Sequence, residues 1–318
     1  FIEAAKVALD QSTTLWGRYP YESLRIAELP KGVLHGLATH EGTTHLETKY
    51  TVTSGNLIAI PEHMGWVNDY RSKPVTDWLL YMTSREVAKV WWGQMVRPSA
   101  TAGTAFLNEG MTALHGLMAL ENAHGIANIR PYVDDLTEAY LRFGSKEDNK
   151  SLPITELDQE GYPYDRNYAK EPAALAMHQI YQVLGKDKFY QVTKPYFDES
   201  KLAPASLADL VDGLTSAAHT DLEKSIVNNA LFDNVFYDYR IHEASAHKLQ
   251  NGQYSVKARI QCTRNPLEGD LERGAYPDTG PVPFLVSDSS GTPLAADAKT
   301  VMCQDGVALL ETAVSGKP

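Results

Sequence analysis

Two neighbouring stretches of helical periodicity, residues 77–92 and 105–122, constrain the fold of this chain more than any other feature. On the first stretch, Arg85 and Lys89 are four positions apart and therefore lie side by side on one helix face. On the second, Glu109 lies in the first turn, and apolar residues recur at the spacing of a buried face. The pattern predicts two cations side by side on one helix and a carboxylate in the first turn of the next.

The composition describes a globular chain and excludes several partners. Of its 318 residues, 43% are hydrophobic and 22% charged, which predicts a large core and two domains. The net charge of −11 argues against nucleic acid and against an anionic membrane surface, because both require clustered positive charge. The sequence also lacks an apolar run of about 18 residues, so we expect no transmembrane segment in it.

The charged residues of the first helix stand in a recognisable motif. Arg85, Glu86 and Lys89 occupy the positions of H-E-x-x-H, in which two histidines four apart bind zinc and the adjacent glutamate is the general base. A W-W-G tripeptide at 91–93 and an L-N-E-G segment at 107–110 follow. In this order the motifs resemble those of the aminopeptidase-N-like gluzincin metallopeptidases, of which the chain looks like a degenerate member.

The resemblance extends over most of residues 19–197 and implies a fold. Residues 19–29 resemble the P-Y-x-x-L-x-I-V-E strand that precedes the active-site helix of that family. We therefore expect an α+β, thermolysin-like (zincin) peptidase domain over residues 1–232, mixed α/β to about residue 75 and a helical lobe after it. Residues 233–318 alternate and cluster as strands, which predicts a C-terminal β-sandwich.

The motif keeps little of the family's metal chemistry. Zinc binds lone-pair donors, and an arginine offers none at physiological pH, while a charged lysine repels a cation. Of the three ligand positions implied by the resemblance, Arg85, Lys89 and Glu109, only Glu109 carries a donor. We therefore expect no bound metal and no cofactor; zinc is expected only if the site uses unusual ligands.

Two further catalytic positions of the family have matching residues here, and its substrate-recognition motif has none. Glu86 stands at the position of the general base, and Tyr168, in Y-A-K-E, matches the tyrosine that donates to the oxyanion in Y-x-K-G. The G-x-M-E-N segment that recognises the substrate is expected near residues 32–45, where no such motif occurs. Glu41 and Glu47 are the candidates for anchoring a substrate amino group.

The two cations can replace the charge that zinc would bring. Arg85 and Lys89 together carry the charge of the dication and are expected to face Glu86 and Glu109. We hypothesise a salt-bridge cluster that holds the two helices in the peptidase arrangement. For an isolated string of this kind a solvated helix face is the usual interpretation. The matching motifs on either side favour the cluster.

Local signals predict the ends of other elements. A helix over residues 1–16 ends at Gly17, and one over 173–184 ends at Gly185, since glycine favours the conformation after a helix. Thr76 or Asp77 can cap the first charged helix, and Thr220 with Glu223 resembles a capping box. Strands are predicted at residues 56–60, 235–241, 253–261 and 283–287, with a turn at Asn251-Gly252.

The cysteines and histidines leave alternatives open. Cys262 and Cys303 can form one disulfide between strands or remain two buried thiols. His35, His40 and His45 recur every five residues, which fits neither one helix face nor one strand face, so loop histidines are favoured over a metal site.

The motif predicts a catalytically inactive pseudopeptidase that binds a peptide or a protein partner. Two alternatives stay open: an active zinc-dependent aminopeptidase with unusual ligands, and a purely structural extracytoplasmic module. The chain resembles the peptidase-like domains associated with bacterial ABC-transporter permeases. This resemblance implies a piece of a larger membrane-associated protein that lies in the periplasm or at the cell surface. The start at Phe1, without a signal peptide, also indicates a piece of a longer protein.

Overall fold

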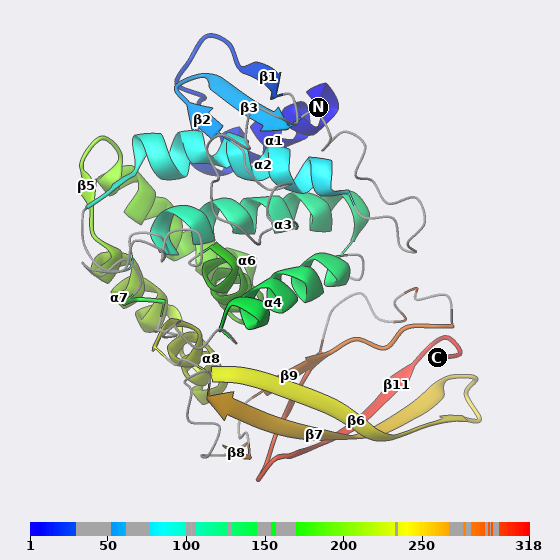
Figure 1. Cartoon of the computed structure of the whole chain (residues 1–318). Coiled ribbons are helices and arrows are strands. Elements are labelled where there is room, and N and C mark those ends of the chain that lie inside the picture. Colours follow the sequence, from blue (N-terminus) through cyan, green and yellow to red (C-terminus); the bar gives the residue numbers. More distant parts are fainter. Residues whose placement is uncertain are drawn as a thin grey trace. The chain divides into compact units, whose positions relative to one another are not determined.

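The computed structural model divides into two units (Figure 1). It describes residues 1–29, 52–61, 77–99, 103, 106–125, 129–144, 154–156, 170–232, 235–266, 276–277, 281–289, 292, 294 and 299–318. Residues 1–141 and 154–217 form the first unit, and residues 142–153 and 218–318 form the second. The domain boundary predicted at residue 232 stays a prediction. Over the described ranges, no helix combines the length and the apolar character needed to cross a membrane.

The first unit combines helices with a small sheet, as predicted for an α+β peptidase domain. Its helices are α1 (Ile2–Trp16), α2 (Trp78–Lys89), α3 (Met111–His124), α4 (Arg130–Gly144), α6 (Lys170–Ser200) and α7 (Leu207–Ala217). Two π-helical turns, η3 (Val90–Met95) and η4 (Phe106–Gly110), adjoin α2 and α3. Its strands are β1 (Arg25–Leu29), β2 (Val52–Ser54), β3 (Leu57–Pro61), β4 (Arg97–Pro98) and β5 (Pro204–Ala205).

Several helix ends lie where the local signals predicted them. α1 stops at Gly17, whose φ is 99° and whose N–H donates to the Thr13 carbonyl at 3.0 Å. Asp77 caps α2, since its Oδ1 accepts from the Leu80 N–H at 3.0 Å. The helix end predicted at Gly185 is confirmed: with φ 75° this residue lies outside helical geometry, and a second helical segment follows it to Ser200 within α6 (Lys170–Ser200). The glycine therefore divides α6 into two helical segments, since glycine favours the conformation that follows a helix.

The small sheet lies against α2 (Figure 1). Its order is β1-β3-β2, with β1 parallel to β3 and β2 antiparallel to it, so the predicted strands at 19–29 and 56–60 are confirmed. Ile58 and Ile60 of β3 are fully buried. The sheet therefore holds the β2–β3 turn beside the charged helix.

Helices α2 and α3 pack closely against each other. Gly116 of α3 lies against Tyr81 of α2, so that a Cβ on this glycine would come within 2.6 Å of the tyrosine ring. Leu107, Met111, Leu114 and Met118 are buried, as predicted for the inward face of the second stretch. This close approach brings the C-terminal half of α2 near the start of α3.

Aromatic side chains fill the core beside these helices. Trp91 and Trp92 are both fully buried. The Trp92 ring packs against Trp16 of α1 at a centroid distance of 4.9 Å and against Phe197 of α6 at 5.5 Å. The W-W-G motif therefore contributes core packing to this part of the fold.

In the C-terminal part of the second unit, α8 (Asp221–Phe232) is followed by strands. The capping box is confirmed: the Thr220 N–H donates to Glu223 Oε2 at 3.2 Å, and the Glu223 N–H donates to Thr220 Oγ1 at 3.1 Å. The strands are β6 (Val235–Lys248), β7 (Tyr254–Pro266), β8 (Tyr276–Pro277), β9 (Pro281–Phe284), β10 (Lys299–Met302) and β11 (Val307–Val314). The predicted turn at Asn251-Gly252 joins β6 and β7, and φ of Gly252 is 84°.

Two sheets of this unit share one buried cluster. The larger sheet has the order β11-β7-β6, with β8 also paired to β7, and the smaller one pairs β10 with β9. Ile260, Cys262, Val282, Cys303 and Ala308 from both sheets pack together, as expected for a β-sandwich. Cys262 and Cys303 are joined by a disulfide with their Cα atoms 6.5 Å apart, which decides between the two alternatives for the cysteines.

The buried His115 of α3 predicts a pH dependence of stability. Trp16 Nε1 donates to its Nε2 at 2.5 Å, and burial lowers the pKa of His115 to about 3. Below the ordinary histidine pKa of about 6.5, His115 binds a proton in the unfolded chain but not in the folded one. The free energy of unfolding therefore falls as the pH drops toward 3.

Replacing this histidine should flatten that dependence. In His115→Gln the side-chain oxygen can still accept from Trp16, and the slope of unfolding free energy between pH 6 and 4 should fall by up to about 1.4 kcal/mol per pH unit. Urea titrations across this pH range measure the slope, with His219→Gln, an exposed position, as the matched control. An unchanged slope in His115→Gln would contradict the prediction.

Candidate functional site

The charged residues of the motif lie on the C-terminal half of α2, next to a change of helical geometry. Asp77 starts the helix, and α2 ends at Lys89, where the π-helical turn η3 begins. Glu109 lies in the other π-helical turn, η4, directly before α3. Such turns are rare and are often found at functional sites. Both helices that carry the motif therefore depart from regular geometry beside it.

Glycines of the two motifs let these turns approach their neighbours. A Cβ on Gly93 of W-W-G would lie 3.0 Å from Asn108 Oδ1 in L-N-E-G. A Cβ on Gly110 would lie 3.0 Å from the Ala173 carbonyl of α6. Since both distances are shorter than ordinary packing contacts, the small residues keep η3, η4 and α6 at their observed separation.

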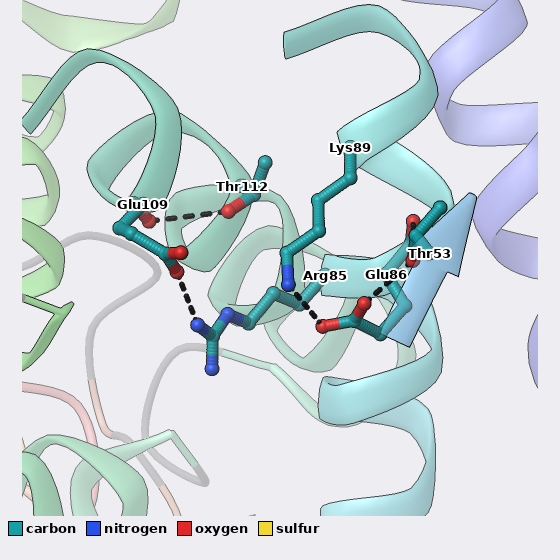
Figure 2. Close-up of polar contacts among 6 residues, drawn as sticks. All are labelled: Thr53, Arg85, Glu86, Lys89, Glu109 and Thr112. Atoms are coloured by element: carbon teal, nitrogen blue, oxygen red, sulfur yellow. Dashed lines mark hydrogen bonds and ion pairs between the residues drawn. The ribbon is translucent and has the colours of Figure 1, made fainter. Parts of the chain in front are cut away.

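An ion pair joins α2 to η4 (Figure 2). Arg85 Nη2 donates to Glu109 Oε2, and the two side chains are only 8% and 15% exposed. Burial alone would lower the pKa of Arg85, but the negative charge of Glu109 outweighs it, with smaller contributions from Tyr81 and Glu86, and the pKa lies above its ordinary value. The guanidinium is therefore permanently charged at this position.

A second ion pair lies within α2 and reaches the small sheet (Figure 2). Lys89 Nζ lies 2.7 Å from Glu86 Oε1, and the Glu86 side chain is fully buried. Thr53 of β2 donates from its hydroxyl to Glu86 Oε2 at 2.6 Å. Both carboxylate oxygens of Glu86 are therefore engaged, one by a cation and one by a hydroxyl.

The structure brings together part of the predicted site. Arg85, Glu86, Lys89 and Glu109 form two ion pairs, one between helices and one inside α2. Tyr168, Glu41 and Glu47 lie outside the described residues, so their roles stay predictions. Thr53, the middle residue of β2, was not predicted from the sequence. Its position 33 residues before Glu86 gave no local signal, because only the sheet brings it there.

The residues at the motif do not fit the zinc that the resemblance implies. Arg85 has no lone pair to offer, and the Lys89 ammonium is bound to Glu86. Glu109 is then the one donor among the three ligand positions, and a structural or catalytic zinc needs three or four. In the described part of the chain, no group of three or more histidine, cysteine, aspartate or glutamate side chains could hold a metal ion.

Removing the cation from the buried pair should destabilise the first unit. Lys89→Met leaves the enclosed Glu86 carboxylate without its cation, and such a loss costs on the order of 3–5 kcal/mol. Chemical denaturation measures the change in unfolding free energy.

The matched control for this substitution is another helical lysine in an ion pair. Lys194→Met removes a pair with Asp198 at 2.8 Å whose side chains are 39% and 44% exposed, and the expected loss is below about 1 kcal/mol. If Lys89→Met unfolds with the wild-type free energy, the ion pair between Lys89 and Glu86 does not stabilise this part of the fold.

Comparisons with known proteins identify the family of the chain. The model of the peptidase family M1 domain matches residues 48–229, which is more than half of the 318 residues. A search of the curated proteins found no match. Among solved structures, aminopeptidase A from Legionella pneumophila, in complex with aspartic acid, is 16% identical with a TM-score of 0.53. That match covers 100% of this chain and 32% of the other.

A second solved structure covers less of this chain. The M1 zinc metallopeptidase from Deinococcus radiodurans is 17% identical with a TM-score of 0.47, covering 72% of this chain and 42% of the other. The chain thus spans less than half the length of either protein. At these identities the likeness to solved structures concerns the fold alone, and the family match carries the assignment: the chain belongs to peptidase family M1.

Proposed function

We propose that this M1 domain is a catalytically inactive pseudopeptidase that binds a peptide or a protein partner. The observation that carries the proposal is the pairing of Arg85 with Glu109 and of Lys89 with Glu86. These contacts put two cations at the positions that correspond to zinc ligands, and they use the one carboxylate that could still donate to a metal. A dication at this position would meet two positive side chains instead of lone pairs.

The state of Glu86 supports the same proposal. A general base must reach the water from which it takes a proton, within hydrogen-bond distance. The Glu86 side chain is fully buried, Lys89 lies 2.7 Å from its Oε1, and Thr53 donates to its Oε2 at 2.6 Å. A carboxylate enclosed in this way stabilises the fold around α2 and presents no exposed surface to a substrate water.

The proposed setting is a larger, membrane-associated protein outside the cytoplasm. The resemblance to peptidase-like domains linked to bacterial ABC-transporter permeases supports this setting. The disulfide between Cys262 and Cys303 favours an oxidising compartment, because cytosolic thiols are kept reduced. Mass spectrometry of the native protein, alkylated before reduction, should find these two cysteines linked; if both carry the alkyl group, the extracytoplasmic placement is wrong.

The competing function is an active zinc aminopeptidase with unusual ligands. Membership of family M1 and the retained carboxylates Glu86 and Glu109 are the features that favour it. The two functions differ in whether hydrolysis occurs and whether it depends on metal. They also differ in the effect of Glu86→Gln. In an active enzyme this substitution removes the general base and lowers the rate of hydrolysis, whereas an inactive pseudopeptidase has no hydrolysis for it to change.

An assay of aminoacyl-arylamide hydrolysis separates the two. We expect the purified chain to release arylamine no faster than the protein-free blank, with added zinc, with chelator and with neither, because no metal-activated water forms. The Glu86→Gln variant should give the same result. Hydrolysis that chelator abolishes and zinc restores, and that Glu86→Gln reduces, would show that the chain is an active metallopeptidase.

A further inference from the structure

The guanidinium of Arg85 uses only part of its hydrogen-bonding capacity. It has five N–H donors in a planar fork, and its ion pair with Glu109 engages the terminal nitrogen Nη2. Among the described residues, Nε has no acceptor. Figure 2 shows the other terminal nitrogen pointing away from Glu109. The ion pair therefore leaves donors of a buried cation available.

Such donors are expected to find a partner. The Arg85 residue is only 6% exposed, and buried N–H groups in native proteins are almost always bonded to protein, water or ligand. Glu109 accepts a hydrogen bond from one guanidinium nitrogen, whereas a carboxylate often accepts from two nitrogens of the same arginine. The side chains of Glu109 and Lys89, which belong to the same cluster, are 15% and 17% exposed.

The charge balance of the cluster selects the kind of acceptor. Lys89 is paired with Glu86 and Arg85 with Glu109, so the formal charges cancel. A carboxylate ligand would add a negative charge beside Glu109 and be repelled by it. A neutral carbonyl oxygen accepts the same hydrogen bonds without that repulsion, and a cationic donor strengthens them.

We propose that Arg85 binds a backbone carbonyl oxygen of a peptide, donating from the terminal guanidinium nitrogen that Glu109 does not use (Figure 2). Arg85 is then a ligand-binding residue, and the Lys89–Glu86–Thr53 contacts hold the helix from which it projects. This inference rests on the proposed function, because it assigns the peptide contact of an inactive domain to the cation that stands at a former metal-ligand position.

Calorimetric titration of the intact chain tests the inference with two probes, N-acetyl-trialanine amide, which offers neutral carbonyls, and acetate, which offers a carboxylate alone. The blocked peptide should bind saturably and acetate should not. In Arg85→Lys, which keeps the charge but loses the planar fork, the dissociation constant for the peptide should rise at least about tenfold. Arg240→Lys, in an exposed pair with Asp238, is the matched control and should stay within about twofold.

Each outcome decides for or against the inference. Peptide binding that Arg85→Lys leaves unchanged, or binding of acetate without the peptide, overturns it. If circular dichroism shows that Arg85→Lys does not fold, wild-type crystals soaked with the peptide decide. A carbonyl oxygen within about 3.2 Å of a guanidinium nitrogen supports the inference, and a peptide bound elsewhere overturns it. The zinc content and arylamidase rate of the same preparation show separately whether the proposed function fails.

Discussion

The ion pair between Arg85 and Glu109 joins two helices where both depart from regular α-helical geometry. Arg85 precedes the π-helical turn η3, and Glu109 lies within η4, directly before α3. The small residues Gly93, Gly110 and Gly116 allow the close approaches that surround this contact. The rest of the site depends on this pair. Without the Glu109 carboxylate, the buried guanidinium would be an uncompensated charge and would destabilise the folded state.

The second ion pair has a different role. Lys89 neutralises Glu86 inside one helix, and Thr53 adds a hydrogen bond from the edge of the small sheet. Together the two pairs connect three elements, β2, α2 and η4. A catalytic zinc would connect its ligands through coordination bonds and keep one position open for water. The ion pairs leave unused donors on Arg85 in place of that open position.

The parts of the fold that depend on local chemistry could be predicted from the sequence. Asp77 caps α2, Thr220 and Glu223 form a capping box, and Gly252 adopts the left-handed turn. The four-residue spacing of Arg85 and Lys89 also placed them correctly on one helix. Gly185 interrupts α6 as its residue type predicted, but the sequence did not show that a second helical segment follows directly.

Features that depend on distant partners could not be predicted in the same way. Thr53 reaches Glu86 through the pairing of β2 with β3, and the choice between thiols and a disulfide depended on the packing of two sheets. Which cation pairs with which carboxylate also needed the structure: Lys89 pairs with Glu86 within its own helix, and Arg85 reaches across to Glu109. The family motif located these four residues, and tertiary packing determined their pairing.

We propose that Arg85 and Lys89 occupy the place of a metal in an otherwise retained arrangement. Zinc titration of the double variant Arg85→His and Lys89→His, beside the wild type, is the decisive measurement. Wild-type protein should bind no zinc, the double variant should bind one equivalent through both imidazoles and Glu109, and adding Glu109→Gln should weaken this binding at least about tenfold. Stoichiometric zinc in the wild type, or a folded double variant that binds none, would contradict the proposal.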